Sequence, residues 1–449
     1  MANAEHKMAT DTNLLTFEKC HLELSRAEFN MDAVLFYAKL IQGVFLAVLN
    51  SFIDYSFYIF LTVILFLVFF LVYKSYLSPV LYVKELSDIG FKHISPGPDR
   101  AERIARAQKA RRLGSKIPPP YPNGWFAVAE TSQLGIGRVL SVDALGQNLC
   151  VYRGEDGVAR CVDAYCPHLG ANLAVGGSVY GNCIECPFHK WKFGENGACV
   201  SVPGIDHPPK GVSIKTWNSV EVDGAIWIWH DAEGRDPLWP MSEVEETKTW
   251  GFRGRNEFVV SAHIQEIPEN GADVAHLNAV HSPSLVSSLG ERYPFLLNII
   301  GCHTWTADWS RNEDHTANLS LTHDYKVLKY DLFHIDASVT QSGPGHVRLL
   351  LKTNFGPMMV SQSVTPIGPL LQKIIHRVYS PKYNAFLGIM MVYSEAYMFE
   401  RDVAIWNSKI FVGAPAYVRT DKTIRLSAHG FRNFIANIAN HSEMLVVIL

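Results

Sequence analysis

Charged side chains are scarce in this sequence. Asp, Glu, Lys and Arg make up 18% of the 449 residues, whereas an average soluble domain has about 25%. The formal net charge is −3, so the composition gives no support for nucleic-acid binding. The sequence also lacks a glycine-rich phosphate loop at a strand-to-helix junction, which argues against a bound NAD or flavin. The length allows two or three domains, each with its own core.

One stretch has no charged residue at all. Residues 55–73 read YSFYIFLTVILFLVFFLVY and lie between Asp54 and Lys74. Their number matches the ~20 residues that a helix needs to cross a bilayer core, so a transmembrane helix is predicted. A buried helix of a globular domain is the alternative. A cleaved signal peptide fits poorly, because the apolar run starts late and no small-x-small cleavage site follows it.

The residues on either side of this stretch indicate its orientation in the membrane. Residues 33–52 are also apolar but include a few polar side chains, which favours an interfacial helix over a second span. Basic residues recur from Lys74 onward, whereas the first seventy residues hold few and mix them with acids. The positive-inside rule then keeps everything after Lys74 in the cytosol. The basic residues at 100–112 are expected to lie on anionic lipid headgroups.

Few cysteines are placed to bind a metal ion together with a histidine. Of eight cysteines, only Cys166 and Cys186 have a histidine at metal-ligand spacing, namely His168 and His189. A cytosolic location argues against a disulfide framework. Two thiolates and two imidazoles suit either zinc or an iron–sulfur cluster, and spacing alone leaves both open.

A second ligand pattern lies downstream. Residues 269–281 read ENGADVAHLNAVH, a Glu-x3-Asp-x2-His-x4-His arrangement. His276 and His281 are five residues apart, so a bend is expected between them if both are to face one side of a helix. Two histidines and one carboxylate can hold Fe(II) with positions left open for oxygen and substrate. The alternatives are a polar helix face for the histidines and a dipole-favoured helix N-terminus for Asp273.

The third ligand must be a distant carboxylate. In the stretch FERDVAIW, the apolar residues at 399, 403 and 406 define one helix face, and Asp402 lies beside it. Glu395 and Glu400 are its rivals.

The pattern of strands and turns predicts two folded units after a stiff proline-rich linker at 117–122. From Trp125 to about Asp231, short strand-like segments alternate with glycine turns, which predicts a small all-β domain whose loops carry the Cys/His pairs. The second unit, from about 250 to 418, is predicted to contain a helix at 268–281, long strands across 319–365 and a helix at about 388–410.

These motifs resemble those of Rieske non-haem iron oxygenases, and specifically of the animal cholesterol 7-desaturases, the Neverland family. The most specific stretches are GEDGVARCVDAYCPHLGANLAVGG, CPFHKWKF, PENGADVAHLNAVH and ERDVAIWN, and the resemblance spans about residues 55–425. Respiratory Rieske proteins carry one more cysteine in each loop, where this chain has Ala171 and Phe188. Lys190 replaces the glycine that is commonest in oxygenases, which predicts an ordinary backbone conformation there.

The resemblance implies two metal centres. A [2Fe–2S] cluster would be held by the four residues Cys166, His168, Cys186 and His189, and a mononuclear non-haem Fe(II) by His276, His281 and Asp402. Asp273 would bridge the centres by hydrogen-bonding an iron-ligating histidine, with His276 as the near partner, and a Rieske histidine corresponding to His189.

The implied fold is α+β: an N-terminal transmembrane helix, an all-β Rieske domain and an α+β catalytic domain of the helix-grip type. The predicted limits are 1–54 for an N-terminal region, 55–73 for the transmembrane helix, 74–122 for the basic segment and linker, 123–235 for the Rieske domain, 236–425 for the catalytic domain and 426–449 for a C-terminal tail. The C-terminal tail does not look like the family's usual terminus.

The activity that the resemblance implies is conversion of cholesterol to 7-dehydrocholesterol, early in ecdysteroid-type hormone synthesis. It would use O2 and electrons from NAD(P)H through a separate reductase or ferredoxin. A homotrimer, a single membrane pass and the endoplasmic reticulum are implied as well. Residues 294–300 and 349–364 would line an apolar pocket or simply belong to the core. The alternatives are oxidation of another ring lipid, 3-ketosteroid hydroxylation, or a non-catalytic, membrane-tethered electron carrier.

Overall fold

The computed structural model describes residues 31–76, 78–110, 117–282, 301–312, 315–327, 330–421, 423–425 and 427. The chain divides into two compact units, residues 1–73 and 74–449, and each is described by itself.

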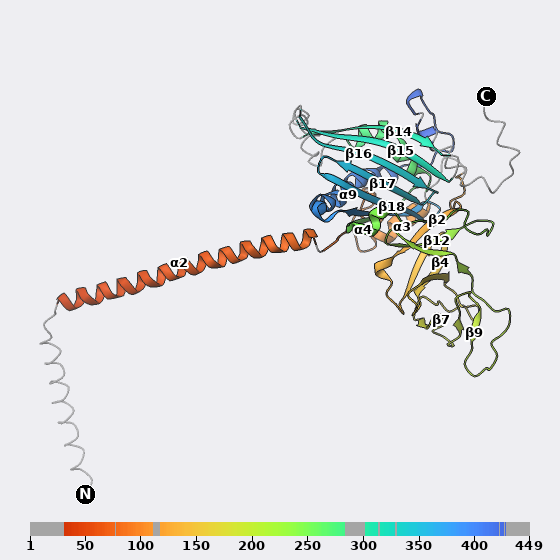
Figure 1. The fold of residues 1–449 in the computed structure, drawn as a ribbon, viewed down its shortest axis with the longest axis horizontal. Helices are drawn as coiled ribbons and strands as arrows, with labels where there is room; N and C mark the ends of the chain where they lie inside the picture. Colours follow the sequence, from red (N-terminus) through yellow and green to blue (C-terminus); the bar gives the residue numbers. More distant parts are fainter. Residues whose placement is uncertain are drawn as a thin grey trace, which may run out of the picture. The chain divides into compact units, whose positions relative to one another are not determined.

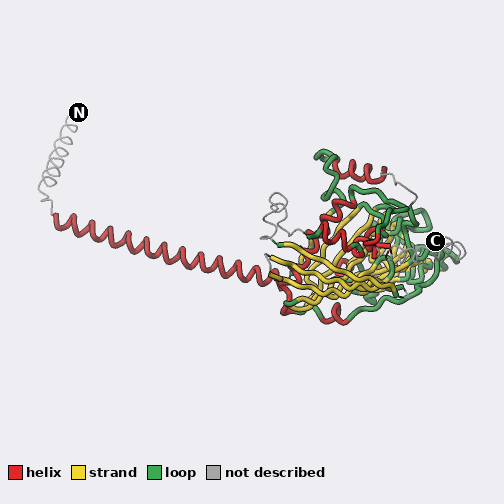
Figure 2. Tube along the Cα trace, turned by 90° about the horizontal axis from the view of Figure 1, so that it is seen from above, coloured by secondary structure: helices red, strands yellow, loops and turns green. Residues whose placement is uncertain are grey.

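A single long helix dominates the first unit. Helix α2 (Met31–Tyr76) has 46 residues, and a rise of 1.5 Å per residue makes it about 69 Å long. Figure 2 shows it as one unbroken helix. Segments 33–52 and 55–73 therefore belong to one helix, which lacks the reversal that a hairpin of two spans requires. Within the described residues, it is the one helix long and apolar enough to cross a membrane.

Three small antiparallel sheets follow the proline-rich linker, and they confirm the all-β prediction for this region. Their orders are β10-β5-β4-β3, β11-β12-β2 and β6-β7-β8-β9. The strands are β2 (Gly124–Glu130), β3 (Val139–Ala144), β4 (Gln147–Arg153), β5 (Ala159–Asp163), β6 (Ser178–Tyr180), β7 (Cys183–Glu185), β8 (Lys192–Phe193), β9 (Cys199–Ser201), β10 (Thr216–Trp217), β11 (Ser219–Val222) and β12 (Ala225–His230).

The remaining strands form one eight-stranded sheet in the order β1-β13-β19-β18-β17-β16-β15-β14 (Figure 1). Strand β1 is parallel to β13, and every other neighbouring pair is antiparallel. The strands are β1 (Val80–Lys84), β13 (Gly251–Val260), β14 (Cys302–Arg311), β15 (Thr316–Val327), β16 (Tyr330–Ser342), β17 (His346–Thr353), β18 (Gly356–Gly368) and β19 (Leu371–Ser380). The long strands predicted across 319–365 are confirmed.

The α-helices that accompany this sheet include α3 (Arg100–Ala110), α4 (Glu245–Thr249), α5 (Glu266–Ala272), α6 (Val274–Val280) and α9 (Ala385–Trp406). Successive side chains of a strand point to opposite faces of the sheet. The apolar ones gather on one face, which packs against α9. Ile335, Ala337, Val339 and Leu351 of that face share a buried cluster with Val392 of α9. The helices predicted near 268–281 and 388–410 are present, the first as the two short helices α5 and α6.

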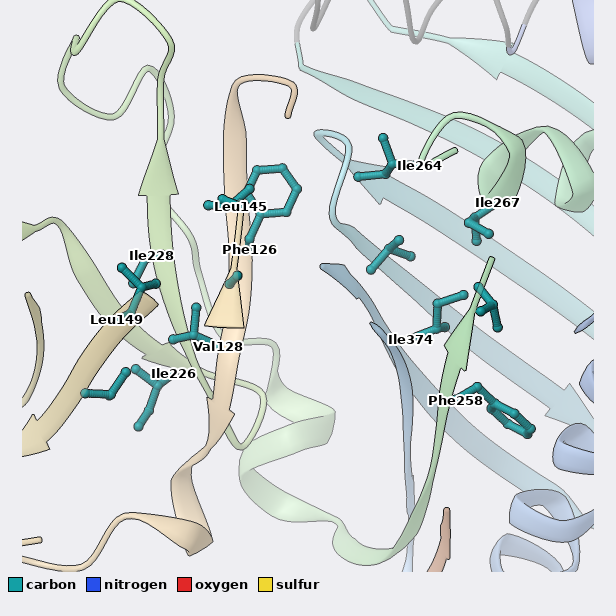
Figure 3. Close-up of a cluster of buried hydrophobic side chains, with 14 of the residues drawn as sticks. Phe126, Val128, Leu145, Leu149, Ile226, Ile228, Phe258, Ile264, Ile267 and Ile374 are labelled. Atoms are coloured by element: carbon teal, nitrogen blue, oxygen red, sulfur yellow. The ribbon is translucent and has the colours of Figure 1, made fainter. Parts of the chain in front are cut away.

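A second hydrophobic core joins the small sheets to the large one. Phe126, Ile226 and Ile228 from the small sheets belong to the same buried cluster as Phe258 and Ile374 from the large sheet (Figure 3). Each such fully buried side chain contributes about 1.5–3 kcal/mol relative to exposure. The two domains are therefore packed together, not loosely tethered.

Buried ion pairs cross the same boundary. Glu130 at the end of β2 accepts from Arg377 of β19 at 2.5 Å and lies 3.2 Å from Arg255 of β13. Burial would raise the pKa of Glu130, but the two guanidinium groups outweigh burial and lower it. Asp223, between β11 and β12, likewise pairs with Arg348 of β17 at 2.7 Å. These contacts fix the orientation of the small sheets on the large one.

We expect Glu130→Gln to destabilise the protein by about 3–5 kcal/mol, because it leaves Arg377 buried without its counter-charge. Thermal unfolding of the full chain in detergent, followed by circular dichroism, measures the loss. The matched control is Glu102→Gln, which removes an exposed carboxylate 3.9 Å from Arg106 and should leave the transition almost unchanged. Equal transitions for the two variants would contradict this account.

Candidate metal centres

Three donor atoms from distant parts of the chain converge on one point. Oδ1 of Asp402 lies 2.8 Å from Nε2 of His276 and 3.0 Å from Nε2 of His281. The two imidazole rings are 4.9 Å apart and nearly perpendicular. Within the described residues this is the one group of three or more such side chains whose donor atoms lie close enough together to hold a metal ion. Two imidazoles and one carboxylate are the ligand set that leaves Fe(II) open positions.

The two histidines are placed by a break in the chain at Asp273. This residue ends α5 and begins α6, with φ −93° and ψ 89°, and its Oδ1 accepts a hydrogen bond from the backbone N–H of His276 at 2.9 Å. Asp273 is thus an N-cap of the kind that stabilises helix starts. The bend expected between His276 and His281 is absent. The helix instead ends at Val280, and His281 occupies its C-cap with ψ near zero, which redirects that side chain.

Helix α9 delivers the carboxylate. Phe399, Val403 and Trp406 are buried along one face of this helix, as their spacing predicts, and Asp402 lies next to them at 6% exposure. The two rival carboxylates lie elsewhere. Glu400 accepts from the Tyr82 hydroxyl at 2.5 Å, and Glu395 lies 2.9 Å from Nδ1 of His376.

The protonation state of the site suits a divalent cation. Burial would raise the pKa of Asp402, but hydrogen bonds with His276 and His281 outweigh it and lower the pKa, so the carboxylate is ionised. The Nδ1 atoms of both histidines are buried and have no hydrogen-bond partner in the described part of the chain. In metal sites, the second ring nitrogen of a ligating histidine commonly donates a hydrogen bond to a carboxylate or carbonyl. The Nδ1 atoms of His276 and His281 could each take such an acceptor.

The four Cys/His residues of the small sheets also come together. The His168 and His189 rings are 4.7 Å apart, and Trp191 stacks on His168 at 4.4 Å. The thiols of Cys166 and Cys186 contact each other, and burial together with this contact raises the pKa of Cys166 to about 11. A buried thiol pair of this kind ionises when a cation binds.

The two loops are built alike. Gly170 N donates to Cys166 O at 2.9 Å, and Lys190 N donates to Cys186 O at 3.1 Å. The cysteines are buried at 3% and 1% exposure, whereas His168 is exposed and His189 is partly exposed. This gradient fits a [2Fe–2S] cluster with an inner iron on cysteine and an outer iron on histidine.

The prediction of an ordinary backbone conformation at Lys190 is wrong. Lys190 has φ 59°, close to φ 74° at Gly170 in the matching position of the first loop. Both residues close the same turn back to a ligating cysteine, and that closure requires the left-handed conformation that glycine adopts without strain. The Lys190 ammonium lies 3.3 Å from Glu185.

Sequence spacing missed a second pair of histidines. Nδ1 of His303 on β14 lies 2.7 Å from Nε2 of His323 on β15. Burial, followed by the positive charges of Arg401 and His281, lowers the pKa of His303 to about 4. Burial, followed by the charge of His303, lowers that of His323 to about 3. The two residues are twenty apart, so only the register of the β14–β15 hairpin could have paired them.

The remaining expectations concern the cysteines, the proposed pocket segment and the other histidines. None of the described cysteines forms a disulfide, as expected. Segment 294–300, proposed to line a pocket, lies outside the described residues, as does nearly all of 426–449. His207 is exposed and His263 is buried, and neither belongs to a metal-ligand group in the described chain.

We expect Asp402→Asn to abolish ferrous-iron binding at the three-residue site, because it removes the anionic ligand, while the visible spectrum of the Cys/His loops stays normal. The electron paramagnetic resonance signal of the ferrous–nitric oxide adduct measures occupancy. Glu400→Gln, two residues away on the same helix, is the matched control and should keep the signal. A normal signal in Asp402→Asn would exclude this carboxylate as a ligand.

Comparison with known proteins agrees with this division. Residues 124–218 match the Rieske [2Fe-2S] domain family, which decides between zinc and an iron–sulfur cluster, and residues 228–431 match the C-terminal domain of 3-ketosteroid 9α-hydroxylase. The fold is similar to that of dicamba monooxygenase bound to 3,6-dichlorosalicylic acid, with a TM-score of 0.54 and 16% identity over 71% of this chain and 99% of that one. A Pseudomonas putida NdmA variant with theobromine gives 0.52 and 18%, over 69% and 94%.

Relatives that match most of the chain are more similar to it in sequence than these solved structures are. The cholesterol 7-desaturase of Bombyx mori is 67% identical over 86% of this chain and 85% of its own length. The corresponding enzyme of Drosophila melanogaster is 41% identical over 72% and 77%, and that of Caenorhabditis elegans is 34% identical over 82% and 90%. With both Cys/His loops and the His/His/Asp triad in place, the chain belongs to the cholesterol 7-desaturase family of Rieske oxygenases.

Proposed function

We propose that this protein introduces the C7–C8 double bond of 7-dehydrocholesterol into cholesterol. The observation that carries the proposal is the convergence of His276, His281 and Asp402 on one point in a chain that also holds a Rieske domain. The cholesterol 7-desaturase of Bombyx mori, at 67% identity, supports the choice of substrate. A pure electron carrier would have no use for a second, buried ligand set.

Each residue has a role in this account. Cys166, His168, Cys186 and His189 hold the [2Fe–2S] cluster, and His276, His281 and Asp402 hold Fe(II). Iron in that triad would supply oxygen activation. The protein's own contribution is a low-polarity site: Asp402 and His281 are almost fully buried, so water is excluded from the ligands and the anionic charge needed to retain the cation is preserved.

The reaction balances with one external electron donor. Cholesterol loses two hydrogen atoms, from C7 and C8, and the carbon–carbon double bond forms between these carbons. O2 takes up these two hydrogens, two electrons and two protons, giving two molecules of water. A separate NAD(P)H-dependent reductase or ferredoxin supplies the two electrons through the cluster one at a time.

We expect purified holoenzyme with cholesterol, a reductase, NADPH and O2 to form a sterol with a conjugated 5,7-diene, because desaturation at C7 places the new bond next to the existing one. The characteristic ultraviolet absorbance of the diene measures turnover. Omission of NADPH is the control. A hydroxylated sterol without diene would favour the steroid-hydroxylase alternative, and no product from fully metallated enzyme would rule out this substrate.

The positions of the exposed groups support the proposed trimer. His168 is exposed at the tip of the cluster loops, next to Leu169 at 65% exposure and Phe188 at 60%. Asp273 is half-exposed at the start of α6. We infer that the apolar tip of one chain docks beside Asp273 of its neighbour, so that Asp273 joins His189 of one chain to His276 of the next and shortens the electron path. The unpartnered Nδ1 of His276 supports this role.

We expect mixed oligomers of two inactive variants to regain activity. His276→Ala keeps the cluster and loses the iron, whereas Cys186→Ser keeps the iron and loses the cluster. Every mixed ring of three has one interface at which a cluster-bearing chain faces an iron-bearing one, so mixed rings should recover about a third of the wild-type activity. Diene formation by doubly tagged, co-purified oligomers measures the recovery, and each variant alone is the control. No recovery in confirmed mixed oligomers would place electron transfer within one chain.

The membrane position completes the proposal. Residues 55–73 of α2 make a single pass, with everything after Lys74 in the cytosol at the endoplasmic reticulum. The proposed limits are 123–235 for the Rieske domain and 236–425 for a helix-grip catalytic domain, preceded by the basic segment and linker at 74–122. A tethered enzyme of this kind meets a substrate that partitions into the bilayer.

A further inference from the structure

Six exposed apolar side chains lie at one end of the large sheet. They come from the start of β16, from the turn between β17 and β18, and from the start of α9 with the turn before it. Each is between 47% and 72% exposed: Tyr330, Leu332, Phe355, Tyr383, Phe386 and Met390. We call this set the apolar rim. Single apolar residues are normal on a protein surface, but a contiguous apolar patch marks an interaction site.

Contacts between neighbouring parts make the rim contiguous. The β17–β18 turn touches the segment before α9, because a Cβ on Gly356 would lie 3.1 Å from the ring of Tyr383. On the other side of this turn, the rings of Phe355 and Phe333 stack at 5.9 Å, and Phe333 follows Leu332 on β16. The rim therefore runs from β16 across the ends of β17 and β18 to α9.

The first strand of the second unit starts at the same end of the sheet. Val80 of β1 pairs with Gly254 near the start of β13, and Gly251 of β13 pairs with Ser380 at the end of β19. Ser380 is three positions before Tyr383 of the rim. The chain therefore enters the sheet beside the rim.

This entry point limits how far the rim end can lie from the membrane. The proposed pass through the bilayer ends before Lys74, and Val80 comes six positions after Lys74. Six residues span at most about 20 Å even when they are fully extended. A bilayer that α2 crosses is therefore within reach of the rim in every copy of the chain.

The opposite end of the same strands is occupied by protein. Leu145, in the β3–β4 turn, donates its backbone N–H to Pro366 O of β18 at 2.6 Å. Gln108 of α3 donates to Leu370 O in the β18–β19 turn at 2.6 Å. A rise of 3.3 Å per residue places the two ends of β18 about 40 Å apart. The small sheets and the basic residues of α3 therefore lie far from the rim, so α3 is a separate candidate for contact with lipid.

The chemistry of the rim suits the boundary between lipid and water. Four of its six members are aromatic, and two of these are Tyr330 and Tyr383. Tyrosine is enriched at membrane–water interfaces, where its ring contacts apolar chains and its hydroxyl stays hydrated. The charges at the tip of the β15–β16 hairpin balance, since Lys326 lies 3.4 Å from Asp331. Burial of apolar surface is therefore the main driving force for docking.

We propose that the apolar rim inserts into the interfacial layer of the bilayer that α2 spans. The proposal rests on the proposed membrane pass and is independent of the identity of the substrate. Docking at the rim directs the other end of the large sheet, with the small sheets and their cluster loops, away from the membrane. A separate reductase can then reach the cluster from the cytosol.

The test uses full-length holoprotein in vesicles of radiolabelled phosphatidylcholine. Photoreactive benzoylphenylalanine replaces one residue at a time, at Phe355 or Tyr383 of the rim. Ile136 is the matched control, because it is 65% exposed but lies among the small sheets. After illumination, the two rim positions should carry at least about tenfold more lipid than position 136, because the rim is in the interface and Ile136 is in water. The exposed Lys109 of α3 is probed in the same way and should resemble Ile136.

A charge in the rim should weaken the contact. Phe386→Asp adds an anion at an exposed position and should lower lipid attachment at position 383 at least threefold, because a charged group disfavours insertion. Ile136→Asp should leave that attachment unchanged. Rim positions that carry no more lipid than position 136, or that attach to a second protein chain instead of lipid, would overturn the proposal. More lipid at Lys109 than at the rim would overturn it in favour of α3.

A probe at Phe66, within α2, separates the proposed pass from the rim. Lipid at position 66 but not at 355 or 383 would refute the rim alone, whereas no lipid at position 66 would refute the membrane pass on which the proposal rests. Attachment needs no turnover, so lipid at the rim in a protein that forms no diene would leave the docking surface standing and refute the proposed activity.

Discussion

The structure depends on holding three polar donor atoms at one buried point. A buried carboxylate within about 3 Å of each of two imidazoles has lost its hydration and gains only these two contacts in return, so the surrounding fold must enforce the arrangement. Helix α9 does this from one side through Phe399, Val403 and Trp406 in the core. The Asp273 cap and the end of α6 do it from the other. Arg401 joins the two by donating to Val280 O at 3.1 Å, at the helix end where a cation is favoured.

Rigid contact between the two domains serves the same purpose. The shared core and the Glu130–Arg377 pair leave the cluster loops projecting from a fixed base. In the proposed trimer, the loops that meet a neighbouring chain benefit from such a base, because a docking tip that moved freely would lose entropy at each encounter. Because the cysteines are buried and the histidines reach the surface, electrons would leave the cluster on the histidine side.

Much of this site could be read from the sequence, because its ligands fall in short local patterns. The Cys/His loops and the pair His276 and His281 depend on residues within one turn or one helix, whereas the choice of Asp402 over Glu400 rests on the family resemblance. The failures share a different cause. Lys190 adopts a left-handed conformation because its loop must close on Cys186, and local residue preference does not report that closure.

Two other features depend on longer-range geometry. The redirection of His281 comes from the end of α6, although the five-residue spacing suggested a bend between the histidines. The His303–His323 pair exists only through strand register, which fixes neighbours twenty residues apart. The histidines were visible in the sequence, but nothing near them marked a partner. Segments 33–52 and 55–73 differ in polarity yet form one helix, since helical hydrogen bonds tolerate such a change within a continuous apolar run.

The central claim is that one chain carries two chemically different iron centres, a relay and a site for oxygen. Mössbauer spectroscopy of full-length protein reconstituted with 57Fe tests it directly. The account predicts three irons per chain, two with the parameters of a Rieske cluster and one as high-spin Fe(II) that responds to added sterol. Two irons per chain, both in the cluster, in protein whose His276, His281 and Asp402 are intact would contradict it.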